Sequence, residues 1–282
     1  MSFQPVVPIS GYAGWKFLER TSDTQRAAFA ESRPIQTATD RFRDRIGTVT
    51  TAEQLVADRD LLQVALGAFG LDDDLNNRFF IRKILEGGTQ DRDALANRLS
   101  DSRYAKLADA FGFGDVGPPR TRAPGFADEI IDRYEARQFE RAVGESDNSM
   151  RLALNLEPAL RDIVSANRAG DAQWFALMGN PPVRKVFETA LGFPPSFGSI
   201  DIDQQLDQFK ARSEAVLGTD RLDEVLSIDS RDKLIRLFMV RDAAQSAVAP
   251  GGASVALTLL QQAGPPTVKP RPEHPPADTP SP

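Results

Sequence analysis

Residues 62–71, LQVALGAFGL, carry the pattern that decides the fold: an apolar helix that runs into a glycine and then a leucine. The pattern returns at 102–113, SRYAKLADAFGF, and at 183–193, VRKVFETALGF. Glycine just after a helix favours left-handed backbone geometry, and the Leu or Phe behind it favours the apolar contact of a Schellman motif. We therefore predict that each stretch is a helix closed by its glycine.

The three closing glycines, Gly70, Gly112 and Gly192, are spaced by 42 and 80 residues (112 − 70 and 192 − 112). These spacings are about one and two units of a helix-pair repeat, which predicts successive helical hairpins that pack on one another. Three short matches also fit coincidence, so a true repeat and unrelated helix ends are both open interpretations.

Apolar residues at helical spacing recur through the second half of the chain. They are Phe126, Ile130, Tyr134, Ala142, Val143, then Ile202, Leu206, Phe209, Val216, then Leu234, Ile235 and Phe238. No alternating apolar run bounded by hairpin turns stands out, which argues against strands. We predict an all-α fold in which stacked helical hairpins form a multi-helix array.

Breaks in composition divide the chain into four predicted parts. Residues 1–48 form an N-terminal helical segment, 49–118 a repeat-like helical subdomain that ends in the breaker run VGPP, and 119–263 a second helical subdomain. Residues 264–282 carry eight prolines and almost no large apolar residue, so they bury too little surface to offset the entropy of ordering. We predict that this Pro-rich tail is disordered.

Two further helices are predicted between the first two closing glycines. One covers 72–88, where acidic residues open the helix and a Gly-Gly pair closes it. The next begins near Asp91 and carries Leu95 and Leu99 inward.

Absent side chains exclude several kinds of chemistry. The chain has no cysteine, so disulfides, thiolate nucleophiles and zinc–thiolate or iron–sulfur sites are impossible. Its single histidine, His274, lies in the predicted tail, which removes Ser-His-Asp triads and histidine-ligated metals from the predicted folded part. We therefore expect no catalytic residue, no cofactor and no metal site.

The net charge and the hydropathy of the chain limit the classes of molecule that we expect it to bind. The net charge is −6 and the pI is about 5.0, so no overall field favours nucleic acid or an anionic membrane face. The sequence begins without the features of a cleavable signal peptide, and no apolar stretch has the length of a transmembrane helix. We expect protein partners, no nucleic acid and no membrane insertion.

Two acidic runs suggest cation sites but fit other roles better. In 201–207, DIDQQLD, Leu206 stands where a calcium loop needs glycine, and Arg212 stands where it needs a bidentate Glu. Asp201 and its neighbour two residues on instead suit the cap and first turn of a helix. The three aspartates at 72–74 either gather a divalent ion or stabilise the positive end of a helix, and the second role is favoured.

Two aromatic groups are candidates for partner binding. The first consists of Tyr12, Trp15, Phe17 and Leu18, which precede a polar helix predicted near 22–31. It either pairs with a partner helix or packs on the core, and packing is favoured. The second consists of Trp174, Phe175 and Met178. It forms an exposed knob or, the favoured role, part of a core aromatic cluster.

Three stretches together carry a family resemblance. They are 58–71, ending in AFGL, 80–88, FIRKILEGG, and 96–104, ANRLSDSRY. The chain resembles a domain-of-unknown-function family of alphaproteobacteria whose genes tend to lie in flagellar clusters, over about 42–241. The resemblance implies a flagellar context, and it implies no catalytic residue.

Two hypotheses follow. In the first, the protein is a non-enzymatic structural or assembly-accessory protein of the flagellum that acts through protein–protein contacts. It is then cytoplasmic, or associated with the flagellum after export that needs no cleaved signal. In the second, it is a cytoplasmic enzyme whose site uses carboxylates, tyrosine or lysine. Two buried, close carboxylates in a cleft would favour the enzyme.

Overall fold

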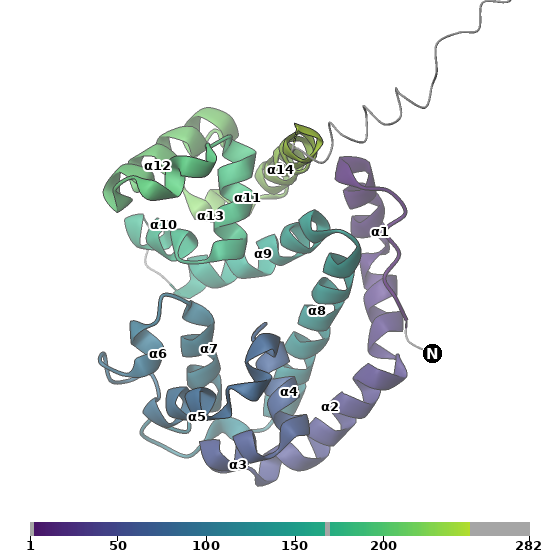
Figure 1. The fold of residues 1–282 in the computed structure, drawn as a ribbon, viewed down its shortest axis with the longest axis vertical. Helices are drawn as coiled ribbons and strands as arrows, with labels where there is room; N and C mark the ends of the chain where they lie inside the picture. Colours follow the sequence, from purple (N-terminus) through teal and green to yellow (C-terminus); the bar gives the residue numbers. More distant parts are fainter. Residues whose placement is uncertain (1–2, 167–169, 249–282) are drawn as a thin grey trace, which may run out of the picture. The chain divides into compact units, whose positions relative to one another are not determined.

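Helices account for the regular structure of this computed structural model, which describes residues 3–166 and 170–248. The described residues contain fourteen α-helices, four short 3₁₀ helices and no strand (Figure 1). The all-α prediction is therefore confirmed. None of the described helices combines the length and the apolar character that a membrane crossing needs. The predicted disordered tail, 264–282, with His274, lies outside the described residues.

The first half of the chain forms a series of mostly short helices. They are α1 (Gly11–Ala30), α2 (Arg33–Arg45), η1 (Ile46–Thr48), α3 (Ala52–Ala57), α4 (Arg59–Ala68), η2 (Asp72–Asn76), α5 (Arg78–Gly87), α6 (Leu95–Arg98), α7 (Ser102–Phe111) and η3 (Arg120–Arg122). The second half contains α8 (Phe126–Ser146), α9 (Asn148–Ala166), α10 (Asp171–Met178), α11 (Pro181–Leu191), η4 (Pro195–Ser199), α12 (Ile202–Leu217), α13 (Leu222–Val225) and α14 (Ile228–Val248).

Two long helices, α8 and α9, support most of the others. The described residues up to Asp242 form one compact unit, to which α8 and α9 belong, and the described residues from Ala243 on belong to a second. Helices α1, α2, α4 and α9 pack against α8, while α10, α11 and α13 pack against α9. Helices α5, α6 and α7 form a smaller group beneath which Ile84, Ala96 and Ala108 make a satellite of the main core.

The three predicted closing glycines all adopt left-handed geometry, with φ of 69° at Gly70, 65° at Gly112 and 77° at Gly192. At Gly70 and Gly192 both bonds of a Schellman motif form. Leu71 N–H donates to Leu66 O and Phe193 N–H donates to Glu188 O, each at 2.9 Å. Gly112 makes the simpler single bond to Ala108 O. The prediction of glycine-closed helices is confirmed at all three positions.

The acidic run at 72–74 opens a different element from the one predicted. A single helix over 72–88 was expected, but Asp72–Asn76 is a 3₁₀ helix and α5 begins only at Arg78. The Asp72 carboxylate accepts hydrogen bonds from Gln138 and pairs with Arg141, both on α8. The three aspartates still lie in the first turn of a helix, η2, and Asp72 has in addition tertiary partners that the sequence did not suggest.

The helix predicted from Asp91 is also shorter than expected. Only α6 is helical there, and Leu95 is exposed while the alanines on either side of it are buried. The Asp91 carboxylate accepts a hydrogen bond from the Asp93 N–H, and this bond holds the residues just before α6 in a turn. In α12, Asp201 caps the first turn as predicted, but Ile202 is exposed and the buried face runs through Leu206 and Phe209.

An aromatic cluster joins α10, α11, η4 and α12. Its members are Trp174, Phe187, Phe193, Phe197 and Phe209, all buried. Their rings lie 3.9 to 5.9 Å apart between centroids, in stacked and edge-to-face pairs. The core role predicted for Trp174 and Met178 is confirmed, whereas Phe175 keeps 39% of its surface exposed.

Candidate functional site

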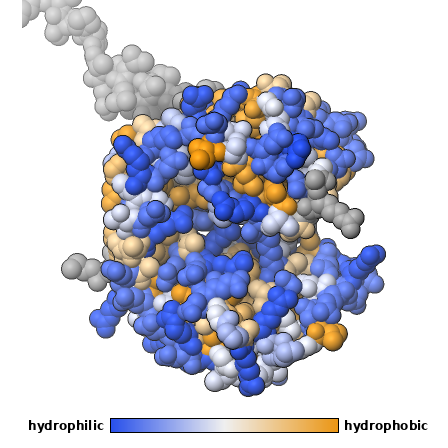
Figure 2. All heavy atoms as spheres, turned by 180° about the vertical axis from the view of Figure 1, so that it is seen from behind, coloured by the Kyte–Doolittle hydropathy of each residue, from blue (hydrophilic) through white to orange (hydrophobic). Residues whose placement is uncertain are grey.

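A groove of about 600 Å³ is lined by residues of α8, α9, η2 and α7 and by the segment that leads into α11. Its six basic side chains are Arg103, Lys106, Arg133, Arg137, Arg141 and Arg151. Its five acidic side chains are Asp72, Asp73, Asp101, Glu140 and Asp162. We call this site the charged groove. The face shown in Figure 2 has a hollow in its middle, bordered by hydrophilic residues together with some hydrophobic ones.

Helical spacing places two rows of these residues on facing helices. On α8, the groove residues Arg133, Arg137 and Arg141 follow one another at intervals of four. On α9, Arg151, Asn155, Ala159 and Asp162 repeat at intervals of four, four and three. Residues three or four apart lie on one face of an α-helix, so each helix presents one continuous row.

Ion pairs connect the two rows to the opposite wall. Arg141 on α8 pairs with Asp72 of η2 at 3.1 Å, and Lys106 on α7 pairs with Asp162 on α9 at 3.0 Å. Each pair joins elements far apart in the sequence. These pairs link the groove walls and neutralise charge, and each contributes at most about 1 kcal/mol because its side chains are partly exposed.

Glu140 is the acidic residue of the groove that is buried. Its carboxylate accepts a hydrogen bond of 2.8 Å from Arg137 Nη1, and Arg137 also donates to the Asn155 side chain. A buried carboxylate needs such a partner, because desolvation would otherwise strongly disfavour its charge. Among the described residues Glu140 is the one charged side chain that is buried, so it is not paired with a second buried carboxylate.

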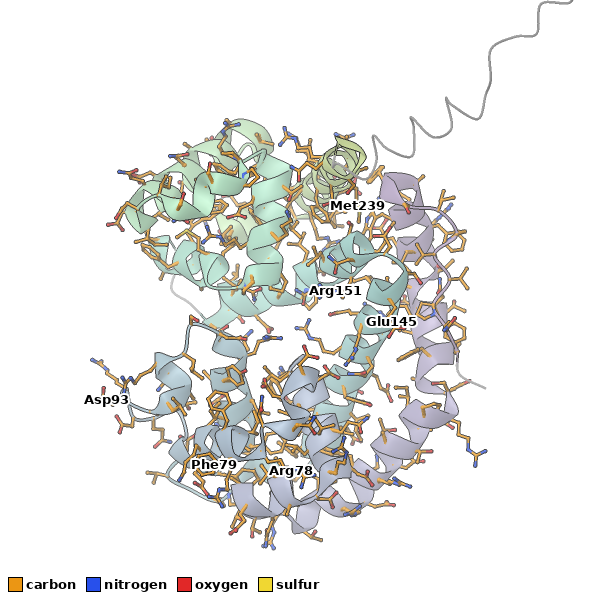
Figure 3. The ribbon with its side chains drawn as sticks, in the orientation of Figure 1. Arg78, Phe79, Asp93, Glu145, Arg151 and Met239 are labelled. Carbon is orange, nitrogen blue, oxygen red and sulfur yellow. The ribbon has the colours of Figure 1, made fainter. Side chains whose placement is uncertain are left out.

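Arg151 is held at the corner between α8 and α9, where Figure 3 labels it. Its Nε and Nη2 groups donate to Asn148 Oδ1 at 3.0 and 2.7 Å. Gly144 on α8 leaves room for the arginine stem, because a Cβ there would lie 2.5 Å from Arg151 Cδ.

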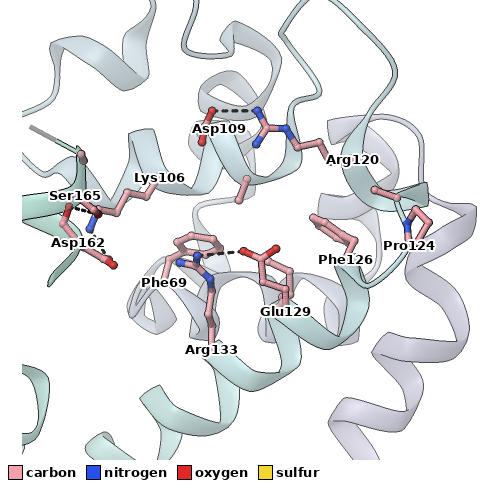
Figure 4. A pocket seen from close by; sticks show the side chains of 14 residues that line it. Phe69, Lys106, Asp109, Arg120, Pro124, Phe126, Glu129, Arg133, Asp162 and Ser165 are labelled. Atoms are coloured by element: carbon pink, nitrogen blue, oxygen red, sulfur yellow. Dashed lines mark hydrogen bonds and ion pairs between the residues drawn. The ribbon is translucent and has the colours of Figure 1, made fainter. Parts of the chain in front are cut away.

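A second cavity of about 440 Å³ adjoins the groove and shares four lining residues with it: Phe69, Lys106, Arg133 and Asp162 (Figure 4). Arg133 lies 5.7 Å from the centre of the Phe69 ring and pairs with Glu129 at 3.1 Å. This placement stabilises the guanidinium by a cation–π contact as well as by charge. The two cavities are thus neighbouring parts of one charged surface.

Two side chains at the start of α7, which lines part of the groove, have shifted pKa values. Burial, followed by the hydrogen bond to Asp74, raises the pKa of Tyr104 to about 12, so the phenol stays protonated. Burial also raises the pKa of Asp101, but the hydrogen bonds and charge of Arg103 lower it by more, and the pKa falls below its ordinary value. Both shifts favour the form that each group has at neutral pH, which is protonated for Tyr104 and ionised for Asp101. Among the described residues no group of three or more potential ligands could hold a metal ion.

The partner-binding residues predicted near the N-terminus lie away from the groove, on α1. Trp15 and Leu18 are buried in the core, and Phe17 is half-buried. Tyr12 donates a hydrogen bond of 2.9 Å to Asp232 on α14. They belong to the same helix as the polar residues 22–31, which were expected to form a separate helix. A partner-binding role for this group stays a prediction, and the surface open to it is that of Tyr12 and Phe17.

The family model for a protein of unknown function, DUF1217, matches residues 68–222. The chain belongs to this family. The expectation of a family of unknown function is thus confirmed, over a narrower range than 42–241, and the flagellar association stays a prediction. A crystal structure of protein AGR_C_984 from Agrobacterium tumefaciens has a similar fold, with a TM-score of 0.67 and 24% identity over 86% of this chain and 99% of that chain. None of the curated proteins matches this chain in sequence.

Sequence reasoning did not find the charged groove, although the family match covers all the charged residues that line it. Its arginines follow ordinary helical spacing, which is equally typical of a solvated helix face. Gly144 leaves room for Arg151, but this contact depends on how α8 and α9 pack together and the sequence alone does not reveal it.

Proposed function

We propose that this protein is a non-enzymatic, flagellum-associated structural or assembly-accessory protein, and that the charged groove is the surface that binds its protein partner. The observation that carries the proposal is the groove itself: eleven charged side chains line it, on walls joined by ion pairs. Small-molecule sites are mostly apolar with a few polar groups, whereas about half of the residues that line this groove are charged.

The charged groove favours partner recognition for a physical reason. Charged groups held in place before binding steer a partner of complementary charge and reject partners of like charge. They also lose little side-chain entropy on binding, because hydrogen bonds already restrict them. The flagellar part of the proposal rests on the family resemblance in 58–104.

A clean deletion of the gene tests the flagellar role. We expect impaired swimming with normal growth, restored when the intact chain is supplied from a plasmid. Normal swimming and normal filaments in the deletion strain would overturn this role.

Fractionation tests the mode of action. A tagged chain is followed through cytoplasm, purified basal bodies and spent medium, with a cytoplasmic enzyme as the marker of leakage. We expect the chain to co-purify with flagellar components in at least one fraction. A chain found wholly free of them in every fraction would contradict the proposal.

A further inference from the structure

Arg151 differs from the other five basic residues of the charged groove. Each of those five has a carboxylate partner: Asp101 for Arg103, Asp162 for Lys106, Glu129 for Arg133, Glu140 for Arg137 and Asp72 for Arg141. Among the described residues Arg151 has none, and its hydrogen bonds run only to Asn148.

The contact with Asn148 leaves one end of the Arg151 guanidinium free. Arginine has five N–H donors, and Asn148 Oδ1 occupies the edge formed by Nε and Nη2. The end formed by Nη1 and Nη2 keeps three donors without a partner in the described part of the chain. Two parallel N–H groups at this end match the two oxygens of a carboxylate.

The Arg151 side chain is positioned before any ligand arrives. Gly144 lets the arginine stem lie against α8, because a Cβ at that position would meet Cδ at 2.5 Å. Asn148 fixes the guanidinium one turn before Arg151 on the same helix. Positioning of this kind reduces the entropy that binding would otherwise cost.

The charge of the groove selects a monoanion. Six basic and five acidic side chains leave one positive charge, although the whole chain has a net charge of −6. A carboxylate neutralises that charge. A phosphate dianion would add a second negative charge close to the carboxylates already present, and like charges repel strongly where solvent is partly excluded.

We propose that Arg151 binds a single carboxylate side chain in an extended, otherwise uncharged segment of a protein partner. The groove and the cavity that shares four of its lining residues offer more room than one side chain needs, which suits a segment of chain. This inference rests on the proposed function, because it names the chemistry that the same groove recognises.

Peptide binding to the full chain tests the inference. The probe is a nine-residue serine peptide with one central glutamate, amidated at its C-terminus and labelled with the zwitterionic dye tetramethylrhodamine, compared with the same peptide containing glutamine. We expect saturable anisotropy with the glutamate peptide and at least about tenfold weaker binding in Arg151→Gln, because charge-assisted bonds are lost. Arg151→Lys keeps the charge without the fork and should lie between wild type and Arg151→Gln.

Arg161→Gln is the matched control. Arg161 lies on the same helix, is exposed, and pairs with Glu157 outside the groove lining. It should bind the peptide within about twofold of wild type, since exposed pairs contribute little. Equal losses in the Arg151→Gln and Arg161→Gln variants, or equal binding of the two peptides, would overturn the inference. Circular dichroism of each variant checks that it is folded.

A competition experiment tests whether the groove prefers a carboxylate to a phosphate. At equal ionic strength, acetate should displace the glutamate peptide more effectively than inorganic phosphate does. Stronger displacement by phosphate would overturn the choice of a carboxylate. These outcomes are independent of the flagellar proposal: normal swimming of the deletion strain would contradict that proposal and leave the peptide result unchanged.

Discussion

The aromatic cluster of α10–α12 and the charged groove of α8–α9 are both close to α9, which lines the groove and packs against α10 and α11, yet they are built by opposite means. Trp174, Phe187 and Phe209 are buried against one another with their rings in contact. The groove instead faces solvent with paired charges, and its side chains are held by hydrogen bonds. We infer that the cluster supplies stability and that the groove supplies binding, so variants in the two regions should have different consequences.

The largest expected effect is in the aromatic cluster. Phe209→Ala should lower the free energy of unfolding by about 4 kcal/mol, because it removes a fully buried ring and leaves a cavity. Urea denaturation measures the loss. Phe175→Ala on the exposed side of α10 is the control and should cost less than about 1 kcal/mol. Similar losses for both would contradict a stability role for the cluster.

The closing glycines give the next effect. Gly192→Ala should cost about 2 kcal/mol, because φ is 77° and the new Cβ, 2.9 Å from Arg241 Nη1, would displace a guanidinium that donates a hydrogen bond to Ala190 O. Gly112→Ala should cost about 1 kcal/mol, because its φ is similar but its nearest neighbour is 3.5 Å away. Thermal and urea unfolding compare the two variants. A larger loss at Gly112 would show that crowding at Arg241 is unimportant.

A groove variant should cost less than Phe209→Ala or Gly192→Ala. Glu140→Gln keeps the size of a buried side chain and an oxygen that can accept from Arg137, but it removes the charge. We expect a loss of about 1 kcal/mol, because Arg137 is partly solvated and keeps its bond to Asn155. Glu129→Gln, in an exposed pair, should change stability by less than about 0.5 kcal/mol. A loss in Glu140→Gln as large as that in Phe209→Ala would erase the distinction between the two regions.

The smallest effect is pH-dependent and lies at the contact of α1 with α14. The hydrogen bond from Lys16 lowers the pKa of Asp232, burial opposes it, and Tyr12 adds to the lowering. A carboxyl whose pKa is lower in the folded state adds stability above its unfolded pKa and loses it as the pH falls through the folded pKa.

Asp232→Asn should therefore be less stable than wild type by about 0.5 kcal/mol at neutral pH, discounted because the pair is exposed. This difference in the free energy of unfolding should disappear below about pH 4, where an aspartate ordinarily becomes protonated. Urea titrations of both chains at several pH values measure it. A gap that widens on acidification would contradict the assignment.

Local features of the fold were predictable from the sequence, and the groove was not. Gly70, Gly112, Gly192 and the Asp201 cap depend on backbone geometry within a few residues, so the local sequence contains the signal. The tertiary partners of Asp72 were not predictable, because Arg141 lies on a helix 69 positions away (141 − 72). The groove depends on several such long-range pairs, and helical spacing alone does not distinguish them from a solvated face.

Complementation of the deletion strain tests the central claim most directly. Wild type, Arg151→Gln and Arg161→Gln are supplied from the same plasmid at equal abundance, checked by immunoblot, and swimming is compared in soft agar. The account predicts that Arg161→Gln restores swimming and that Arg151→Gln does not. Full restoration by Arg151→Gln, in a strain whose deletion abolishes swimming, would contradict the role of the charged groove.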